Sequence, residues 1–107
     1  MKLSDAILLG STLKPQGFGF GSTRPHLDRL CAFGAAYLAL GMGGAMSDLY
    51  PWLDNLDSCP VCMERERIAW IISNHLNDEH RWTRERIALE FVRPLEALLE
   101  PVEMSWR

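Results

Sequence analysis

Two cysteines and two histidines in the second half of the chain have the types and spacing of a metal site. They follow the pattern Cys59-x2-Cys62-x12-His75-x4-His80. A CxxC pair, a gap of about 12 to 15 residues and two histidines about 3 to 5 residues apart form the ligand set of a Cys2His2 zinc site. Two thiolates and two neutral imidazoles complete a tetrahedral Zn2+ site with no open position for substrate. The spacing therefore predicts one structural zinc ion bound by these four residues.

The segments around the ligands decide how they can meet. The two-residue gap between the cysteines predicts a tight turn that aims both sulfurs at one point. Residues 64–77 are predicted to form an amphipathic helix, with His75 on its apolar face in the last turn. Residues five apart on an ideal α-helix point about 140° away from each other. We therefore expect the helix to continue only slightly, or to unwind around residues 77–78, before His80 reaches the site.

Other chemistries use similar residues. A redox CxxC pair opens a helix that follows a strand, and no strand is predicted here. A DNA-reading ββα finger carries an aromatic residue where this chain has Glu66, and residues 63–67 are typical of a helix start. The run from His75 to His80 is one residue longer than an H-x-x-E-H protease motif. A zinc-supported HNH-type nuclease has a β-hairpin before its metal helix and an Asp-His pair. No hairpin is predicted here, and that pair is missing. These patterns disfavour sequence-specific DNA binding and hydrolysis.

The rest of the sequence predicts an all-α fold. Apolar residues recur at three- and four-residue spacing, and Ser4 and Thr83 are candidate N-caps. Pro15 ends the first helix, Pro101 ends the last, and Pro94 is expected to kink or break the last one. The predicted helices cover residues 4–13, 27–42, 64–77 and 84–100, and the zinc knuckle joins the two C-terminal ones.

Length and composition indicate one domain. With 107 residues, 48% apolar and 23% charged, the chain is predicted to form a single zinc-stabilised domain over residues 1–107, with a loosely held tail at about 101–107. The net charge of −3 argues against tight non-specific binding of nucleic acid. Three cysteines and the lack of an apparent signal peptide favour a reducing, cytoplasmic environment.

The uncharged stretch from Leu30 to Ser47 just reaches the length of a membrane span. It is rich in alanine and glycine, which favours a buried core helix, so no membrane partner is expected. Its small residues, including Gly34 and Ala35, would let a second helix approach closely. Cys31 is expected to be a small core residue rather than a ligand or nucleophile.

Residues 47–58 are predicted to form an irregular connector. It contains Tyr50 and Trp52 beside Asp48 and Asp54. An exposed Trp and Tyr rimmed by acids is a common anchor for a protein partner, so these four residues form the candidate interaction surface. The alternative is that Trp52 covers the zinc knuckle.

Three polar and aromatic residues flank the second histidine. Asn77 and Asp78 are predicted to cap the end of the helix over residues 64–77. Trp82 is predicted to act as a hydrophobic staple at the entry to the last helix. The alternative is a recognition role for an exposed Trp82.

Three motifs carry a resemblance to known proteins. They are Cys31-Ala-Phe-Gly-Ala-Ala36, Cys59-Pro-Val-Cys62 and His75-Leu-Asn-Asp-Glu-His-Arg-Trp-Thr83. In these motifs the chain resembles a group of short phage and bacterial proteins that have no assigned activity. The likeness extends from the first helix to about Phe91. It implies a phage or mobile-element origin and agrees with metal binding.

These observations give a functional expectation. A closed zinc site offers no position for chemistry and no nucleophile–base pair is visible, so the chain is not expected to be an enzyme. Small phage proteins often act by binding a host protein. The expected function is therefore that of a zinc-stabilised protein-interaction module, an accessory or host-takeover factor. The alternatives are a nucleic-acid-binding zinc regulator and, after it, a zinc-supported nuclease or hydrolase.

Overall fold

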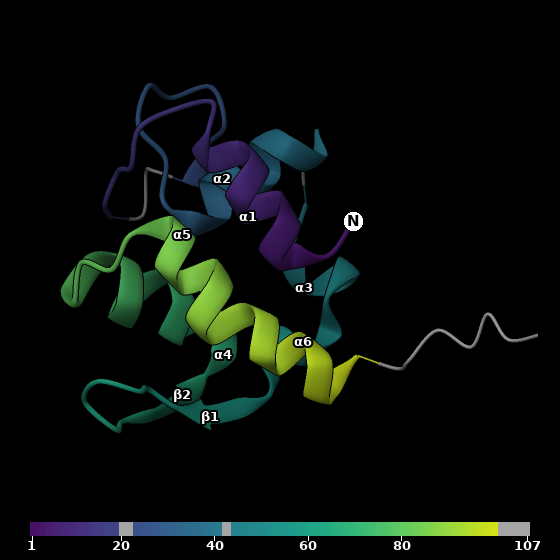
Figure 1. Cartoon of the computed structure of the whole chain (residues 1–107), viewed down its shortest axis with the longest axis vertical. Helices are drawn as coiled ribbons and strands as arrows, with labels where there is room; N and C mark the ends of the chain where they lie inside the picture. Colours follow the sequence, from purple (N-terminus) through teal and green to yellow (C-terminus); the bar gives the residue numbers. More distant parts are fainter. Residues whose placement is uncertain (20–22, 42–43, 101–107) are drawn as a thin grey trace, which may run out of the picture.

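The fold is mostly helical, and a short β-hairpin interrupts the helices (Figure 1). The computed structural model describes residues 1–19, 23–41 and 44–100. The prediction of an all-α fold is right about the helices and wrong about the hairpin. The predicted tail and the predicted helix end at Met42 lie outside the described residues. The elements are α1 (Leu3–Ser11), α2 (Ala32–Leu40), α3 (Met46–Leu49), η2 (Pro51–Asp54), β1 (Leu56–Ser58), β2 (Arg65–Arg67), α4 (Ile68–Trp70), η3 (Ile71–Glu79), α5 (Arg84–Arg86), η4 (Ile87–Val92) and α6 (Arg93–Leu99).

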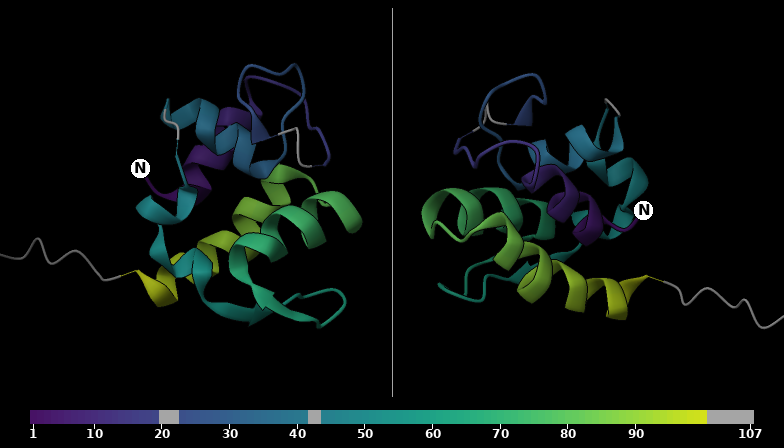
Figure 2. Two further views of the ribbon diagram at one scale, coloured as in Figure 1. Left: turned by 180° about the vertical axis from the view of Figure 1, so that it is seen from behind. Right: turned by 45° about the horizontal axis from the view of Figure 1, so that its top comes forward.

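α1 packs directly on α2, and Figure 2 shows the two helices crossing in both views. Gly10 lies so close to α2 that a Cβ at this position would collide with the carbonyl oxygen of Ala35. The predicted close approach of a second helix to the small residues of α2 is therefore confirmed. Ser4 is not the N-cap of α1, because the helix begins at Leu3 and Lys2 occupies the cap position.

α2 begins later than the predicted start at residue 27. The preceding segment is held in turns, with the Lys14 ammonium donating to the carbonyls of Pro25 and Leu27 at 2.8 and 2.9 Å. Cys31 caps the helix, since its sulfur accepts a hydrogen bond from the Gly34 N–H at 3.4 Å. Across the described ranges, no helix is long and apolar enough to cross a membrane.

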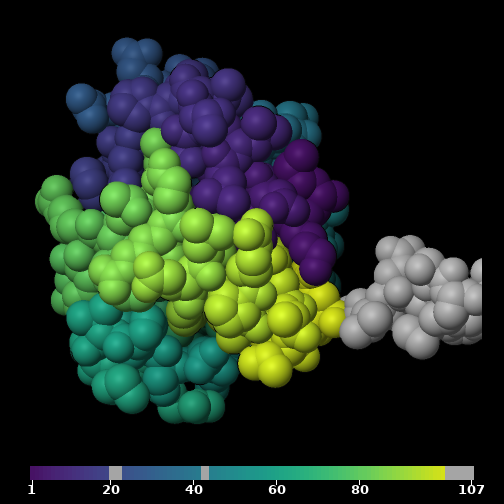
Figure 3. Space-filling model, in the orientation of Figure 1, coloured from purple at the N-terminus to yellow at the C-terminus, as the bar shows by residue number. Residues whose placement is uncertain are grey.

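The C-terminal helix is continuous from residue 84 to residue 99 through α5, η4 and α6. Thr83 caps it as predicted, and its hydroxyl accepts a hydrogen bond from the Arg86 N–H at 3.1 Å. The predicted break at Pro94 is absent, because the backbone of Val92 and Arg93 stays in the right-handed helical region. Figure 3 shows this helix as a green-to-yellow band between the α1 half and the hairpin half of the molecule.

Two buried charges of the C-terminal helix bracket α1. At the start of α1, the Ser4 N–H and hydroxyl donate to the two carboxylate oxygens of Glu96 at 2.8 and 2.6 Å. Beyond its end, the Arg84 guanidinium donates to the carbonyls of Ser11 and Lys14 at 3.3 and 2.7 Å. Each charge therefore has the sign that the α1 dipole favours at that end. The two helices run antiparallel as a result.

The predicted helix start at Glu64 is wrong, because the residues that follow it form the second strand of a β-hairpin. β1 and β2 pair antiparallel, with Asp57 opposite Glu66, and the helix begins only at Ile68. The Ile68 N–H donates to the Asn55 carbonyl at 2.9 Å, which fixes the helix start at the base of the hairpin. Strand pairing here overrides the good helix propensity of the alternating Glu and Arg residues.

The connector before the hairpin is helical rather than irregular, and its aromatic residues are buried. Tyr50 and Trp52 are only 6% and 7% exposed. The Trp52 ring N–H donates to a carboxylate oxygen of Glu100 at 3.1 Å, at the end of α6. The predicted partner-binding anchor is therefore wrong, because both rings pack into the core and are covered from solvent. The acids of that predicted surface, Asp48 and Asp54, are exposed.

Candidate metal centre

The hairpin turn presents both cysteines. The Met63 N–H donates to the Cys59 carbonyl and the Cys59 N–H donates to the Glu64 carbonyl, both at 2.9 Å. Met63 has a left-handed backbone conformation with φ of 66°, which returns the chain into β2. Cys59 is buried beneath the turn and Cys62 is exposed on it. The predicted tight turn is therefore a knuckle at the tip of the hairpin.

The helix that carries both histidines is wound more loosely than an α-helix. η3 follows α4 directly and is π-helical, so its backbone hydrogen bonds join residues five apart. One such bond runs from the His80 N–H to the His75 carbonyl at 2.7 Å. Residues with this spacing lie close to one another along the helix, and both imidazoles come to one side. Of the two predicted alternatives, the slight continuation of the helix is therefore right, since the helix runs to Glu79, and the unwinding around residues 77–78 does not occur.

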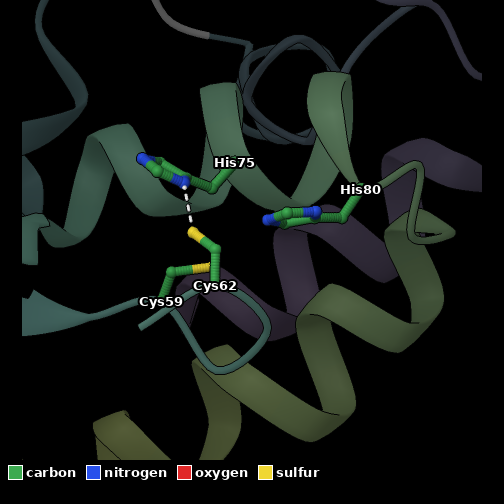
Figure 4. A group of neighbouring side chains, drawn as sticks. All are labelled: Cys59, Cys62, His75 and His80. Carbon is green, nitrogen blue, oxygen red and sulfur yellow. Dashed lines mark hydrogen bonds between the residues drawn. The ribbon is translucent and has the colours of Figure 1, made fainter. Parts of the chain in front are cut away.

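The knuckle and the end of η3 bring the four donors together, as Figure 4 shows. Their ligand atoms all lie within 4.8 Å of one another. Cys62 Sγ lies 3.3 Å from His75 Nδ1. A tetrahedral ion with Zn–S bonds of about 2.3 Å and Zn–N bonds of about 2.0–2.1 Å separates sulfur from nitrogen by about 3.5 Å. The spacing of the four side chains therefore suits one metal ion.

The surroundings of two of the donors, His80 and Cys62, favour a bound cation. His80 Nε2 is buried and, within the described residues, has no hydrogen-bond partner. Such a buried polar atom costs about 1–3 kcal/mol of stability. The pKa of the Cys62 thiol is raised: a hydrogen bond involving the Glu64 backbone lowers it, but desolvation and the neighbouring Cys59 outweigh that bond. A bound cation would relieve both features, because it accepts the nitrogen lone pair and favours the thiolate.

Asn77 connects the metal centre to the N-terminal half of the molecule. Its buried side-chain oxygen accepts hydrogen bonds from the Ala32 N–H at 3.2 Å and from the Gln16 amide at 3.1 Å. Its amide nitrogen donates to the Gly17 carbonyl at 3.0 Å and to the Asp78 carboxylate at 2.8 Å. The predicted capping role is therefore wrong for Asn77, which holds neighbouring segments rather than its own helix end.

A backbone turn closes the end of η3. Arg81 has a left-handed conformation with φ of 57°, and the Trp82 N–H donates to the Leu76 carbonyl at 2.8 Å. The Trp82 ring packs against the core and remains partly exposed, with the Arg86 guanidinium carbon 3.8 Å from its centre. These contacts agree with the predicted structural role of Trp82.

The third cysteine and third histidine lie outside the site. Cys31 is buried at the start of α2, as expected for a small core residue. His26 is exposed in the segment that precedes α2. The spacing of the sequence therefore selected the four converging residues from all the Cys and His of the chain.

Two acidic residues near the site escaped the sequence analysis. A ring nitrogen of His75 and the carboxylates of Glu64 and Glu66 lie within 4.8 Å of one another. Their proximity depends on the return strand, which places the residues after the second cysteine beside the helix. Only a prediction of the hairpin would have revealed it.

The order of strand, knuckle, strand and helix is that of a ββα zinc finger. The chain matches no protein-family model, no curated protein and no solved structure. The presence of the hairpin removes one argument against a DNA-reading finger or a hairpin-containing nuclease. The helix nevertheless differs from a recognition helix, which keeps its first turns free for base edges. Here Ile68, Ile71 and Ile72 of those turns are buried in the core.

Proposed function

We propose that Cys59, Cys62, His75 and His80 bind one structural Zn2+ ion. The observation that carries this proposal is the convergence of four donors within 4.8 Å, among them the buried Nε2 of His80, which has no hydrogen-bond partner among the described residues. Thiolate and imidazole ligands in a tetrahedral arrangement suit zinc. Four protein ligands fill that shell and leave no position for water or substrate, which supports a structural role over a catalytic one.

The ion would stabilise the short β-hairpin formed by β1 and β2. β1 and β2 pair over only three residues each, and an isolated two-stranded hairpin is marginally stable in water. A shared ion links the tip of this hairpin to the end of η3. The energy of metal binding thereby becomes energy of folding for the C-terminal half.

Metal analysis of the purified full-length chain tests the zinc site. Native mass spectrometry is expected to find one zinc ion per chain, and Cys59→Ser is expected to lose it. Cys31→Ser is the matched control, because serine can also cap α2 and Cys31 lies outside the cluster. Zinc content well below one equivalent in the unmodified chain, or equal content in the two variants, would contradict the site.

We further propose that the zinc-stabilised domain is a protein-interaction module, with its binding surface on the hairpin rather than on the connector. Leu56, Val61 and Met63 are 60%, 48% and 69% exposed. Exposed apolar side chains on one short hairpin are candidates for contact with a protein partner. The resemblance to phage proteins leads us to propose a host protein as the partner, and hence an accessory or host-takeover role in the cytoplasm.

Capture from host lysate tests the interaction surface. The chain is expected to retain a nuclease-resistant protein partner, and the double variant Val61→Ser/Met63→Ser is expected to lose it while keeping zinc. Leu13→Ser is the control, because Leu13 is an exposed apolar residue on the first loop. Retention of the same partner by the double variant would place the interface elsewhere.

A nucleic-acid-binding regulator is the second candidate, favoured by the ββα order of the elements. The buried isoleucines of the helix start and the net charge of −3 count against it. Capture that disappears on nuclease treatment, with the expected steep salt dependence, would favour this candidate over a protein partner.

A further inference from the structure

The two ring nitrogens of His75 face different partners. Nδ1 lies 3.3 Å from Cys62 Sγ, on the side of the metal cluster. Nε2 lies 3.7 Å from a carboxylate oxygen of Glu64, on the opposite side. The His75 side chain is only 5% exposed, so its ring is held between these partners. A neutral imidazole carries one proton, and its surroundings decide which nitrogen holds it.

The knuckle itself sets the position of Glu64. The Glu64 carbonyl accepts the Cys59 N–H, and the left-handed Met63 before it returns the chain towards the helix. One short loop therefore supplies both thiols and a carboxylate beside His75. Glu66 adds a second negative charge within 4.8 Å. Both carboxylates favour a proton on Nε2 of His75, which faces away from the cluster. Nδ1 is then free to bind a cation.

We propose that Glu64 is a positioning residue for the metal centre, and that the two histidines bind through different nitrogens. His75 binds through Nδ1 while its Nε2–H faces the Glu64 carboxylate, 3.7 Å away, and His80 binds through Nε2. His80 Nε2 is buried and has no hydrogen-bond partner in the part of the chain that the structure describes, which supports the second assignment. A carboxylate beside the ring N–H that does not bind the metal fixes the orientation of a ligating histidine and raises the basicity of its metal-binding nitrogen. This inference rests on the proposed zinc site and specifies its coordination.

Long-range 1H–15N correlation spectra of the zinc-loaded, 15N-labelled full chain test the assignment. His75 is expected to show a protonated Nε2 and a metal-bound Nδ1. His80 is expected to show the reverse pattern. The spectrum of the unmodified chain needs no variant to fold.

Two matched substitutions test the role of Glu64. Glu64→Gln removes the charge and is expected to weaken Zn2+ binding about tenfold and to speed exchange of the His75 Nε2 proton. Glu79→Gln makes the same charge change on an exposed residue next to His80 and is expected to change affinity less than about twofold. Competition with a chromophoric chelator measures both affinities.

The possible failures are distinguishable. A chain that binds no zinc would overturn the proposed function and this inference together. A zinc-loaded chain with the metal on His75 Nε2 would overturn the inference and leave the zinc site intact. Equal weakening by the two substitutions would show a general charge effect and remove Glu64 as the positioning residue.

Discussion

α1 and the knuckle at the tip of the hairpin satisfy their polar groups in opposite ways. At α1 the chain supplies both counter-charges, with Glu96 at the start and Arg84 beyond the end. At the knuckle four donors converge, and His80 Nε2 finds no partner in the described part of the chain. Packing and hydrogen bonds within the chain therefore specify the first region, whereas the second has a donor set that could hold a cation.

Asn77 belongs to both regions. Its backbone lies between His75 and His80, and its side chain hydrogen-bonds to Gln16, Gly17 and Ala32 of the N-terminal half. Loss of metal should therefore weaken the knuckle first and reach α1 only through the helix that the regions share.

Removal of zinc should have the largest effect. Structural zinc sites contribute on the order of 10 kcal/mol of apparent binding energy, so part of that energy stabilises the hairpin. Chelation should speed hydrogen exchange of the Cys59 amide about 100-fold or more. The Gly17 and Leu30 amides, which donate to backbone carbonyls in the N-terminal half, should change less than about tenfold. If chelation speeds hydrogen exchange equally at the Cys59, Gly17 and Leu30 amides, the claim that only the knuckle depends on metal would be contradicted.

Glu96→Ala should have the next largest effect. It leaves the buried Ser4 N–H and hydroxyl without an acceptor, and we expect a loss of about 3 kcal/mol in the free energy of unfolding. Denaturant titration should give the same loss with zinc present. Glu90→Ala is the control, because its ion pair with Arg86 is exposed and should contribute less than about 0.5 kcal/mol. A loss that zinc abolishes would show that the two regions are not independent.

Asn77→Ala should cost less but should affect both regions. The variant leaves the Ala32 N–H and the Gly17 carbonyl without their side-chain partner, at a cost of about 2 kcal/mol. It should also weaken zinc binding, because it loosens the segment between the two histidines. Asn74→Ala, on the same helix, should change both quantities little. Unchanged zinc affinity in Asn77→Ala would mean that the shared helix does not couple the regions.

Trp82→Ala should have the smallest effect of the four. The ring is partly exposed and stacked on Arg86, so we expect about 1–2 kcal/mol rather than the cost of a fully buried tryptophan. Thermal unfolding measures the change, with the exposed Trp70→Ala as control. A change below about 0.5 kcal/mol would instead favour a recognition role for Trp82.

The convergence of the four Cys and His donors could be predicted, because their intervals in the sequence match those of a metal site. The geometry that joins them could not. Arg65 and Arg67 are exposed in β2, so no alternation of apolar and polar residues marks the strand. The π-helical winding that brings His75 and His80 together is likewise missed, because the apolar spacing of residues 64–77 is interpreted with ordinary α-helical geometry.

The error at Tyr50 and Trp52 has a different cause. Local composition indicates that an aromatic pair beside acids can be exposed, but burial depends on which distant element covers it. Here Glu100, at the end of α6, binds the Trp52 ring N–H. The two residues are 48 positions apart in the sequence, so a local pattern cannot reveal the contact. Helices with internal apolar periodicity, such as α2 and η3, were predicted because their signal is local.

X-ray absorption of the zinc-loaded chain tests the central claim most directly. The account predicts four ligands in the first shell, two sulfurs at about 2.3 Å and two nitrogens at about 2.0–2.1 Å. It also predicts imidazole scattering from two rings, and the loss of one sulfur or of the metal itself in Cys62→Ser. A shell with fewer than two sulfurs, or one completed by water oxygens, would contradict the closed Cys2His2 site.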